Sequence, residues 1–313
     1  MKNHPEEPSA PLNITSDFQH PLLVGEVLFD CFPNGRSVIG GAPFNVAWNL
    51  AGFGCDPLFF SAVGDDALGR QVVSLMKEWQ MNAQSVAVLP GLPTGRVDVV
   101  NAETEPEYLF QDDCAWDHLR LEAAEFALDR CALLYHGSLA ARAETSRAAI
   151  LKLREEPALP VFVDLNLRPP FFERSMLPSL AKGAQWLKIN ALELELLTEV
   201  LGVHGDDLLS RARAVGESLQ VPHLLVTDGK KGAYWVAPHG DSAFQAAPVV
   251  ERFVDSVGAG DAFASVSIYG ILQRWEPSLI LKRAVTFAAH ICEIQGATTK
   301  NRQFYDDELK QWK

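Results

Sequence analysis

Short apolar segments of strand length alternate with amphipathic segments of helical length, and this alternation limits the possible folds more than any other feature of the chain. Apolar strands are predicted at 22–29, 57–63, 85–89, 132–135, 161–163, 186–189 and 224–226. Helices are predicted at 43–51, 67–79, 121–128, 143–153, 191–198 and 206–219, with one more between 163 and 186. Strands that are apolar on both faces need helices on both faces, which is typical of a parallel sheet. The pattern therefore predicts a doubly wound α/β fold.

Residues 94–110 depart from this alternation. Apolar residues such as Val97, Val99 and Tyr108 recur at alternate positions on either side of the turn-forming segment 103–106, which is the pattern of a β-hairpin. A hairpin added to an α/β chain is either a small lid over a pocket or an extension of a sheet edge. The pattern alone leaves both interpretations open.

Charge and cysteine usage limit the partners and the compartment. The chain has 40 acidic and 27 basic side chains, a formal charge of −13, so it repels a nucleic-acid backbone and we expect no such partner. Its five cysteines are scattered and never spaced as Cys-x-x-Cys, which is typical of reduced thiols. Residues 1–20 form a polar tail without the apolar core of a signal peptide, and no later segment is apolar enough to span a membrane. We expect a cytoplasmic protein with no membrane partner.

The sharpest local pattern is the run of small residues at 255–261 (DSVGAGD), which precedes apolar residues at helical spacing. Small residues before a helix let backbone N–H groups approach an anion, and the helix N-terminus adds about half a positive charge. A phosphate or oxyanion cradle is therefore predicted at Gly258, Ala259 and Gly260. Asp261 would lie in the first helical turn, either as a capping carboxylate or as a general base, and the spacing leaves both open.

Other phosphate and catalytic motifs do not match. Gly229-Lys230 is followed by Lys231, so the chain has no Walker loop, and the run at 258–260 lacks the third glycine of the dinucleotide fingerprint. The sequence also contains neither Gly-x-Ser-x-Gly nor His-Glu-x-x-His. These observations argue against a Walker nucleotidase, a Rossmann dehydrogenase, a hydrolase of the nucleophile-elbow type and a zinc protease.

Three further motifs precede the small-residue run, in the order 25–30 (GEVLFD), 40–47 (GGAPFNVA) and 64–69 (GDDALG). Taken with 255–261, they resemble the ribokinase or PfkB carbohydrate kinase family, and the second resembles its fructokinase branch. The resemblance covers about 22–298. It implies one domain over 21–313, a ribokinase-like three-layer α/β sandwich with a mostly parallel central sheet and a small β-lid that includes 94–110.

The resemblance implies an enzyme that uses ATP and Mg²⁺, with a monovalent cation such as K⁺, to phosphorylate a sugar hydroxyl. Asp261 would take the proton from that hydroxyl, and the backbone of Gly258, Ala259 and Gly260 would form the anion hole. The expected substrate is a ketohexose such as fructose. The alternatives are a 2-keto-3-deoxygluconate kinase, a nucleoside kinase, or a non-catalytic sensor of sugars or nucleotides on the same scaffold.

The resemblance also assigns binding roles to individual residues. The implied sugar-binding residues are Asp30, Gly41, Asn45, Arg96 and Arg168. The implied nucleotide-binding residues are Asn190, Thr227, Gly229 and Gly232. Glu193 would lie near the hydration shell of Mg²⁺, and Asp255 with the segment 296–297 would hold the monovalent cation. Without the resemblance, Asp30 is equally a strand-end residue, Asn45 a helix-face amide, and both arginines ordinary surface residues.

The chain departs from the family pattern at a few positions. Ser256 replaces the usual threonine but keeps the hydroxyl, whereas Phe171 and Phe172 stand where fructokinases commonly have tryptophan, and Glu199 stands where glycine is frequent. The last two departures concern the identity of the sugar and the shape of a loop. A homodimer through the lid is expected because exposed strand edges tend to pair. The alternative is a monomer whose lid edge is protected by the glutamates at 103, 105 and 107.

Overall fold

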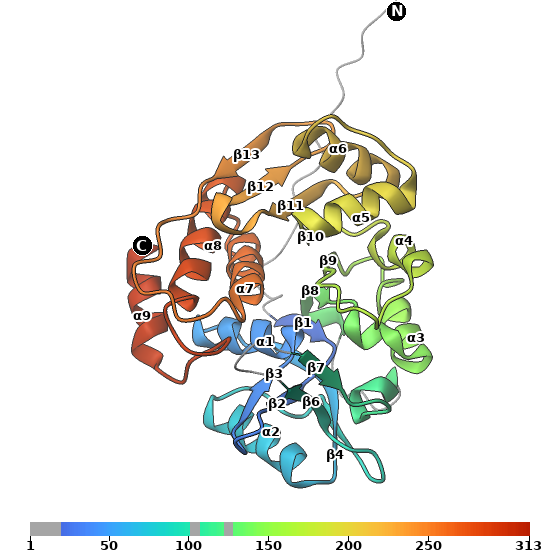
Figure 1. Ribbon diagram of the computed structural model, residues 1–313, viewed down its shortest axis with the longest axis vertical. Coiled ribbons are helices and arrows are strands. Elements are labelled where there is room, and N and C mark those ends of the chain that lie inside the picture. Colours follow the sequence, from blue (N-terminus) through green and yellow to red (C-terminus); the bar gives the residue numbers. More distant parts are fainter. Residues whose placement is uncertain (1–19, 101–106, 122–127) are drawn as a thin grey trace, which may run out of the picture.

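The computed structural model describes residues 20–100, 107–121 and 128–313 (Figure 1). The predicted tail before His20, the turn of the predicted hairpin and most of the predicted helix at 121–128 lie outside these residues. The described residues form two sheets, one of nine strands and one of four. In this part of the chain, no helix has both the length and the apolarity needed to cross a membrane.

The larger sheet has the strand order β13-β12-β11-β10-β9-β8-β1-β4-β5. Its strands are β1 (His20–Val24), β4 (Leu58–Gly64), β5 (Val86–Leu89), β8 (Cys131–His136), β9 (Val161–Asp164), β10 (Trp186–Asn190), β11 (His223–Thr227), β12 (Ala233–Val236) and β13 (Ser242–Gln245). Neighbours from β5 to β11 pair in parallel, and β12 and β13 are added antiparallel at one edge. The predicted mostly parallel sheet is confirmed.

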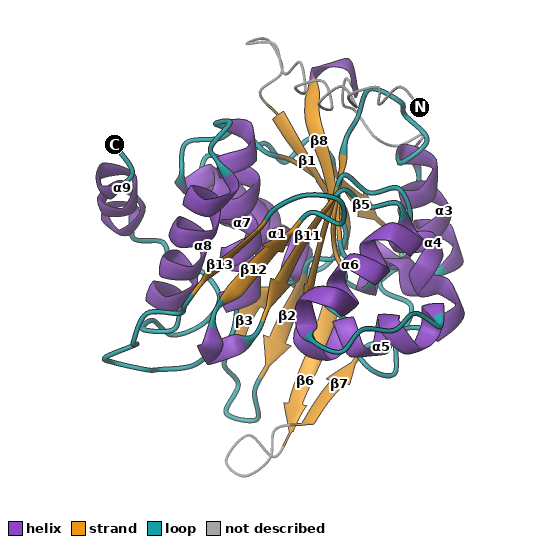
Figure 2. Cartoon of the chain, turned by 90° about the horizontal axis from the view of Figure 1, so that it is seen from above, coloured by secondary structure: helices purple, strands orange, loops and turns teal. Residues whose placement is uncertain are grey.

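Helices cover both faces of this sheet (Figure 2). One layer contains α1 (Ala42–Gly52), α2 (Ala67–Glu78), α7 (Ala259–Leu272) and α8 (Pro277–Ile291). The other contains α3 (Glu144–Leu153), α4 (Leu177–Ala181), α5 (Ala191–Leu201) and α6 (Leu208–Leu219). The C-terminal helix α9 (Arg302–Gln311) packs onto the first layer through Tyr305. The predicted three-layer sandwich is confirmed.

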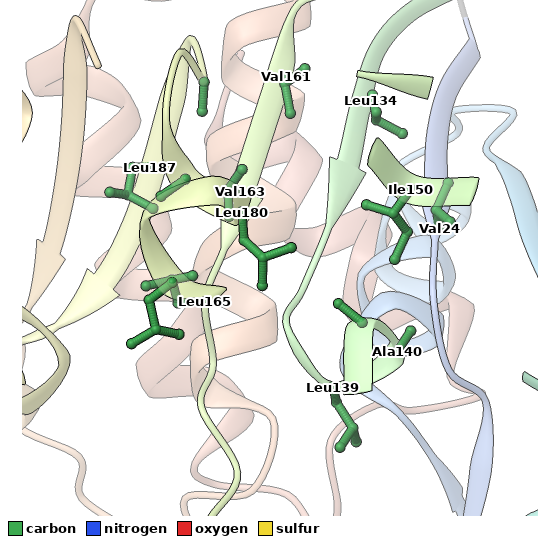
Figure 3. Packing of buried hydrophobic residues seen from close by; sticks show 14 of the residues in the cluster. Val24, Leu134, Leu139, Ala140, Ile150, Val161, Val163, Leu165, Leu180 and Leu187 are labelled. Atoms are coloured by element: carbon green, nitrogen blue, oxygen red, sulfur yellow. The ribbon is translucent and has the colours of Figure 1, made fainter. Parts of the chain in front are cut away.

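The apolar strands supply both cores. In β9, Val161 and Val163 lie in the core toward α3–α6, whereas Phe162 between them lies in the core toward α1, α7 and α8. Figure 3 shows Val161 and Val163 together with Leu134 and Leu187 of the neighbouring strands. Successive side chains of a strand point to opposite faces, so a strand covered on both sides is apolar at most of its positions. This requirement explains the continuous apolar segments in the sequence.

The smaller sheet has the order β3-β2-β6-β7 and extends beyond the three layers (Figure 2). Its strands are β2 (Leu28–Cys31), β3 (Ser37–Gly40), β6 (Gly95–Val100) and β7 (Glu107–Phe110). β6 and β7 pair antiparallel, so the predicted hairpin is confirmed. We call this sheet the lid.

The prediction of a single strand over 22–29 is wrong. The chain leaves the larger sheet after Val24 and enters the lid at Leu28. Gly25 between them has φ of 149°, and a Cβ atom there would lie 2.5 Å from Cγ of Pro43. The close approach of the start of α1 therefore makes the chain turn at this glycine, although the apolar run continues through it.

The winding of the larger sheet determines where a site can lie. From β1 the chain first adds β4 and β5 on one side, then returns to add β8 to β11 on the other side. The carboxyl ends of β1 and β8 therefore meet at a topological switch point, where ligands of open α/β sheets bind. The residues that follow these strand ends are the first place to look for a functional site.

Substitution of Phe162 tests how much the packing of the core contributes to stability. Its side chain is fully buried between Tyr135 and Trp186, with ring centroids 6.0 and 6.4 Å away. We expect Phe162→Ala to lower the free energy of unfolding by about 3–5 kcal/mol, because it leaves a cavity between strand and helices. Val88→Ala, at a side chain that is 51% exposed, should change it by less than about 0.5 kcal/mol. Urea denaturation measures both, and equal losses would contradict this account of the core.

Candidate active site

Helix α7 begins on the predicted run of small residues. Gly258 caps the helix with φ of 78°, and a Cβ atom there would lie 2.3 Å from Cα of Ala297. The position therefore requires glycine on two independent grounds, conformation and space. The amides of Ala259 and Gly260 belong to the first turn of this 14-residue helix and therefore lie at its positive end. Gly260 is exposed to solvent. These residues lie where the predicted anion cradle requires them, and we call this start of α7 the cradle; its binding of an anion stays a prediction.

Asp261 joins this cradle to the start of α1. Its side chain is 8% exposed, and the side-chain amide Nδ2 of Asn45 donates a hydrogen bond to its Oδ2 at 2.8 Å. Asn45 lies in the first turn of α1, four residues after the N-cap residue Gly41, whose φ is 105°. A Cβ atom on Gly41 would lie 2.6 Å from the carbonyl oxygen of Glu26, so this turn also requires glycine. Two motifs 216 residues apart in sequence therefore form one contact.

A buried ion pair lies beneath the cradle, and sequence reasoning missed it. Nζ of Lys188 lies 2.8 and 2.9 Å from the two carboxylate oxygens of Asp164. The same Nζ lies 3.5 Å from the position that a Cβ of Gly260 would occupy. Burial lowers the pKa of Lys188, but the Asp164 carboxylate raises it more, so the ammonium remains charged beside the cradle. The available signal was a lysine inside an apolar strand segment and an aspartate that ends another.

Three carboxyl groups near the cradle and the lid have a raised pKa. Burial raises the pKa of Asp261 to about 6, that of Asp30 to about 6 and that of Glu26 to about 7. The positive charge of the Arg168 guanidinium, on an exposed residue, acts against this rise and lowers the pKa of all three. Clusters of this kind are typical of functional sites. Glu26 was missed by sequence reasoning; its signal was an acidic residue between two apolar strand segments.

The structure does not bring Arg96 to the other predicted sugar-binding residues. The register pairs Arg96 with Phe29 and Val97 with Asp30. Since neighbours along a strand point to opposite faces, Arg96 lies on the face of the lid opposite to Asp30. Its Nε donates to Oδ1 of Asp98 at 2.7 Å, and its side chain is 49% exposed.

The four predicted nucleotide-binding residues lie at adjacent strand ends. Asn190 ends β10 and is the register partner of Thr227, which ends β11. Gly229 and Gly232 form the turn that follows, with φ of 51° and 124°. A Cβ atom on Gly232 would lie 2.0 Å from the carbonyl oxygen of Gln245, so the turn can pass close to that backbone only with glycine.

Glu193 has a structural task in this site. Its Oε2 accepts the backbone N–H of Asn190 at 2.8 Å, while Asn190 Oδ1 accepts the N–H of Glu193 at 2.9 Å, which completes a capping box. Its Oε1 accepts the N–H of Leu167 at 2.7 Å and so holds the loop that carries Arg168. Among the described residues, no group of three or more His, Cys, Asp or Glu side chains is arranged to hold a metal ion.

Asp255 connects the two segments predicted to hold a monovalent cation. Its Oδ1 accepts the N–H of Val257 at 2.8 Å, and its Oδ2 accepts the N–H of Gly296 at 3.2 Å. Gly296 precedes Ala297, which packs against the Gly258 cap. The predicted cation segment therefore adjoins the cradle.

Phe171 connects the Arg168 loop to the lid. Its ring lies 5.0 Å from that of Phe110 at the end of β7, and the guanidinium of Arg142 lies 5.1 Å from the ring. A cavity of about 380 Å³ lies beside this contact and is lined by Phe171, Phe172 and Arg142, among others. The departure from the usual tryptophan therefore affects the wall between the lid and the larger sheet.

Comparison with known proteins assigns the family. Residues 32–303 match the pfkB family carbohydrate kinase. The chain belongs to this family. It is a carbohydrate kinase, an enzyme that transfers a phosphoryl group to an alcohol group of a sugar. The predicted family and enzyme class are confirmed.

Relatives of this carbohydrate kinase include Fructokinase-1 of Oryza sativa subsp. japonica, 30% identical over 304 residues, which cover 88% of this chain and 91% of that protein. The structure of a fructokinase with bound ATP from Xylella fastidiosa has a TM-score of 0.82 at 22% identity and covers 94% of this chain and 99% of that one. A fructokinase double mutant from Vibrio cholerae O395, in fructose, ADP and potassium ion bound form, has a TM-score of 0.76 at 24% identity, covering 94% and 99%. The likeness to these structures confirms the fold.

The raised pKa of Asp261 predicts how stability depends on pH. Burial raises the pKa of Asp261 in the folded chain to about 6, whereas the ordinary pKa of an aspartate, as in the unfolded chain, is 3.8. Between these values the folded state binds more protons, so this group lowers the free energy of unfolding as pH rises through the window. Asp261→Asn removes the titration. We expect the variant to have the higher Tm at pH 7.5 and a Tm close to that of the unaltered enzyme at pH 4, measured by scanning fluorimetry. A gain that grows toward acid pH would contradict the assignment.

Proposed function

We propose that this carbohydrate kinase transfers the γ-phosphoryl group of ATP to the primary hydroxyl of a ketohexose such as fructose. The observation that carries the proposal is the position of Asp261: a buried carboxylate, held by Asn45, directly beside a helix N-terminus that can receive an anion. Fructokinases are among its relatives, and the Vibrio cholerae neighbour is in fructose and ADP bound form.

Asp261 would act as the general base. A carboxyl with a pKa of about 6 is mostly ionised at neutral pH and is a stronger base than an ordinary aspartate. It would accept the proton of the sugar hydroxyl as the oxygen attacks the γ-phosphorus. The bond between that phosphorus and the bridging oxygen breaks, and ADP leaves with the electron pair. The amides at the start of α7 and the ammonium of Lys188 would stabilise the charge in transit.

The sugar would lie between the lid and the carboxyl ends of the strands. Asp30 can accept hydrogen bonds from hydroxyl groups, and Asn45 and Gly41 form the wall beside the base. Arg168 would donate to sugar or phosphate oxygens. Arg96 stays a prediction from the family resemblance alone.

ATP would lie along the turn formed by Thr227, Gly229 and Gly232, beside Asn190. Mg²⁺ would enter with ATP and neutralise charge on its phosphates. Because both oxygens of Glu193 accept backbone hydrogen bonds, its contact with this ion would run through water. A monovalent cation fits the junction of Asp255 and Gly296, where a carboxylate lies beside the cradle. Bound there, it would add a fixed positive charge close to the anion hole.

Two observations bear on the alternative functions. Arg168 is an exposed cation in the site, as an acidic sugar such as 2-keto-3-deoxygluconate would need. Three carboxyl groups compete for it, however, which favours a neutral sugar. A sensor needs no buried base, so the environment of Asp261 supports an enzyme over a binding protein.

The lid supports a proposal about assembly. Tyr108 and Leu109 of its edge strand β7 are 52% and 49% exposed, and an exposed apolar edge is suited to pair with a second copy. We propose a homodimer through the lid. The glutamate turn that would protect a monomer lies mostly outside the described residues.

Activity across a substrate panel tests the proposed reaction. We expect ADP release with MgATP and fructose, and weaker release with ribose, 2-keto-3-deoxygluconate and adenosine. Asp261→Asn should lower kcat by roughly 10²- to 10⁴-fold, because the variant has no base for the hydroxyl proton. Full turnover by Asp261→Asn would remove the assignment of the base. Strong turnover on another member of the panel would replace fructose as the substrate.

The pH profile tests the same base independently. Since burial raises the pKa of Asp261 to about 6, kcat/KM should be constant above neutral pH and fall about tenfold per unit well below pH 6. The profile is measured by coupled assay between pH 5 and 8. A profile that stays flat down to pH 5 would show that the base has an ordinary aspartate pKa.

A further inference from the structure

Helices α1 and α7 are joined by two side-chain hydrogen bonds, one helical turn apart. The first is the bond of Asn45 Nδ2 to Asp261 Oδ2 at 2.8 Å. The second is the bond of Asn49 Nδ2 to Ser265 Oγ at 3.3 Å. On each helix the two partners are four residues apart, so they lie on the same face. The second bond therefore repeats the first at a distance from the cradle.

The second bond also reaches the backbone of the proposed base. Oγ of Ser265 donates to the carbonyl oxygen of Asp261 at 2.6 Å. Asn49 is held from its other side, because the hydroxyl of Tyr305 in α9 donates to Asn49 Oδ1 at 2.8 Å. The donors and acceptors match at every step, from the Tyr305 hydroxyl through the Asn49 amide and the Ser265 hydroxyl to the Asp261 carbonyl. One path thus connects the C-terminal helix to the start of α7.

The path lies entirely inside the molecule. Asn49, Ser265 and Tyr305 are each 0% exposed. Gly52 of α1 leaves the space that the Tyr305 ring occupies, since a Cβ atom at this position would lie 2.5 Å from the ring. A buried polar group that loses its partner is costly, so a fully paired chain of this kind favours a single arrangement of the helices that carry it.

We infer that Asn49, Ser265 and Tyr305 are positioning residues, which hold α1 and α7 in the register that keeps Asp261 against Asn45 and aimed at the sugar hydroxyl. The inference rests on the proposed function, because it concerns the reaction in which Asp261 is the base. It extends the site to the C-terminal helix α9, which carries none of the residues proposed to bind sugar or ATP. Small errors in the position of a catalytic group can lower a rate up to about 100-fold. Residues that fix the position of Asp261 can therefore affect kcat without touching the substrate.

Ser267 provides a matched control on the same helix. Its side chain is also 0% exposed, and its Oγ donates to the carbonyl oxygen four residues earlier, that of Phe263, at 2.8 Å. Within the described residues, no hydrogen bond joins Ser267 to α1. Ser265→Ala and Ser267→Ala therefore delete the same group in the same setting, and differ in whether the path to Asn49 is broken.

Steady-state kinetics with ATP and the sugar compare Ser265→Ala, Ser267→Ala and Tyr305→Phe, with the Tm of each. We expect Ser265→Ala to lower kcat about 5- to 50-fold with KM for ATP within twofold, and Tyr305→Phe to lower kcat less. Because the two variants break one path, their combined effect should be smaller than the product of the single effects. Ser267→Ala should lower the Tm by about as much as Ser265→Ala does, but its kcat should stay within twofold of that of the unaltered enzyme. Equal loss of kcat in the two serine variants would overturn the inference.

Hydrogen exchange separates this inference from the proposed function. Backbone amides of residues 261–265, measured by mass spectrometry on the enzyme without substrates, should exchange several-fold faster in Ser265→Ala and Tyr305→Phe than in the unaltered enzyme. Ser267→Ala should leave them unchanged. If the unaltered enzyme phosphorylates no sugar, the proposed function fails and the exchange comparison alone decides the inference. Exchange that rises equally in both serine variants would overturn it.

Discussion

The hydrogen bond between Asn45 and Asp261 is the contact on which the candidate site depends. It joins the first turn of α1 to the first turn of α7, 216 residues apart in sequence. Each helix starts at a glycine with positive φ, Gly41 and Gly258, and at each of these a Cβ would collide with neighbouring backbone. Packing must therefore place the two starts together, because the cradle and the buried base lie on α7 whereas the amide that holds the base lies on α1.

The charges buried near this contact decide what chemistry the site can perform. Burial makes Asp261 a stronger base, while the Asp164–Lys188 pair beneath it keeps a cation close to the helix N-terminus. An isolated charge at that depth would be costly, and the pairing lets Lys188 stay charged without solvent. Arg168 follows Leu167, whose N–H is held by Glu193, and its positive charge lowers the pKa of Asp261. A site of this kind can move a proton and stabilise a phosphoryl group at one point.

Much of the fold could be predicted from local pattern, and the misses have physical causes. Apolar segments marked the parallel strands correctly because burial on both faces favours apolar residues at most positions. The same signal failed at 22–29, where the apolar run continues through the turn at Gly25 and hides the passage from the larger sheet into the lid. Family motifs pointed to Asp261, Asn45 and Asp255 and their neighbours. Lys188 and Asn49 lie outside the quoted motifs, and Glu26 lies within one but was assigned no role, since a charged or amide side chain within an apolar segment shows its partner only after folding.

The sequence by itself determined the layered α/β architecture and the family, because periodicity and short motifs are local properties. Tertiary structure alone decided which side chains meet. It placed Arg96 on the far face of the lid by strand register, set Lys188 under the cradle, and linked Tyr305 of the last helix to the carbonyl of Asp261. These outcomes depend on the crossing of helices and the pairing of strands that are distant in sequence, and no local pattern encodes a distance between two such elements.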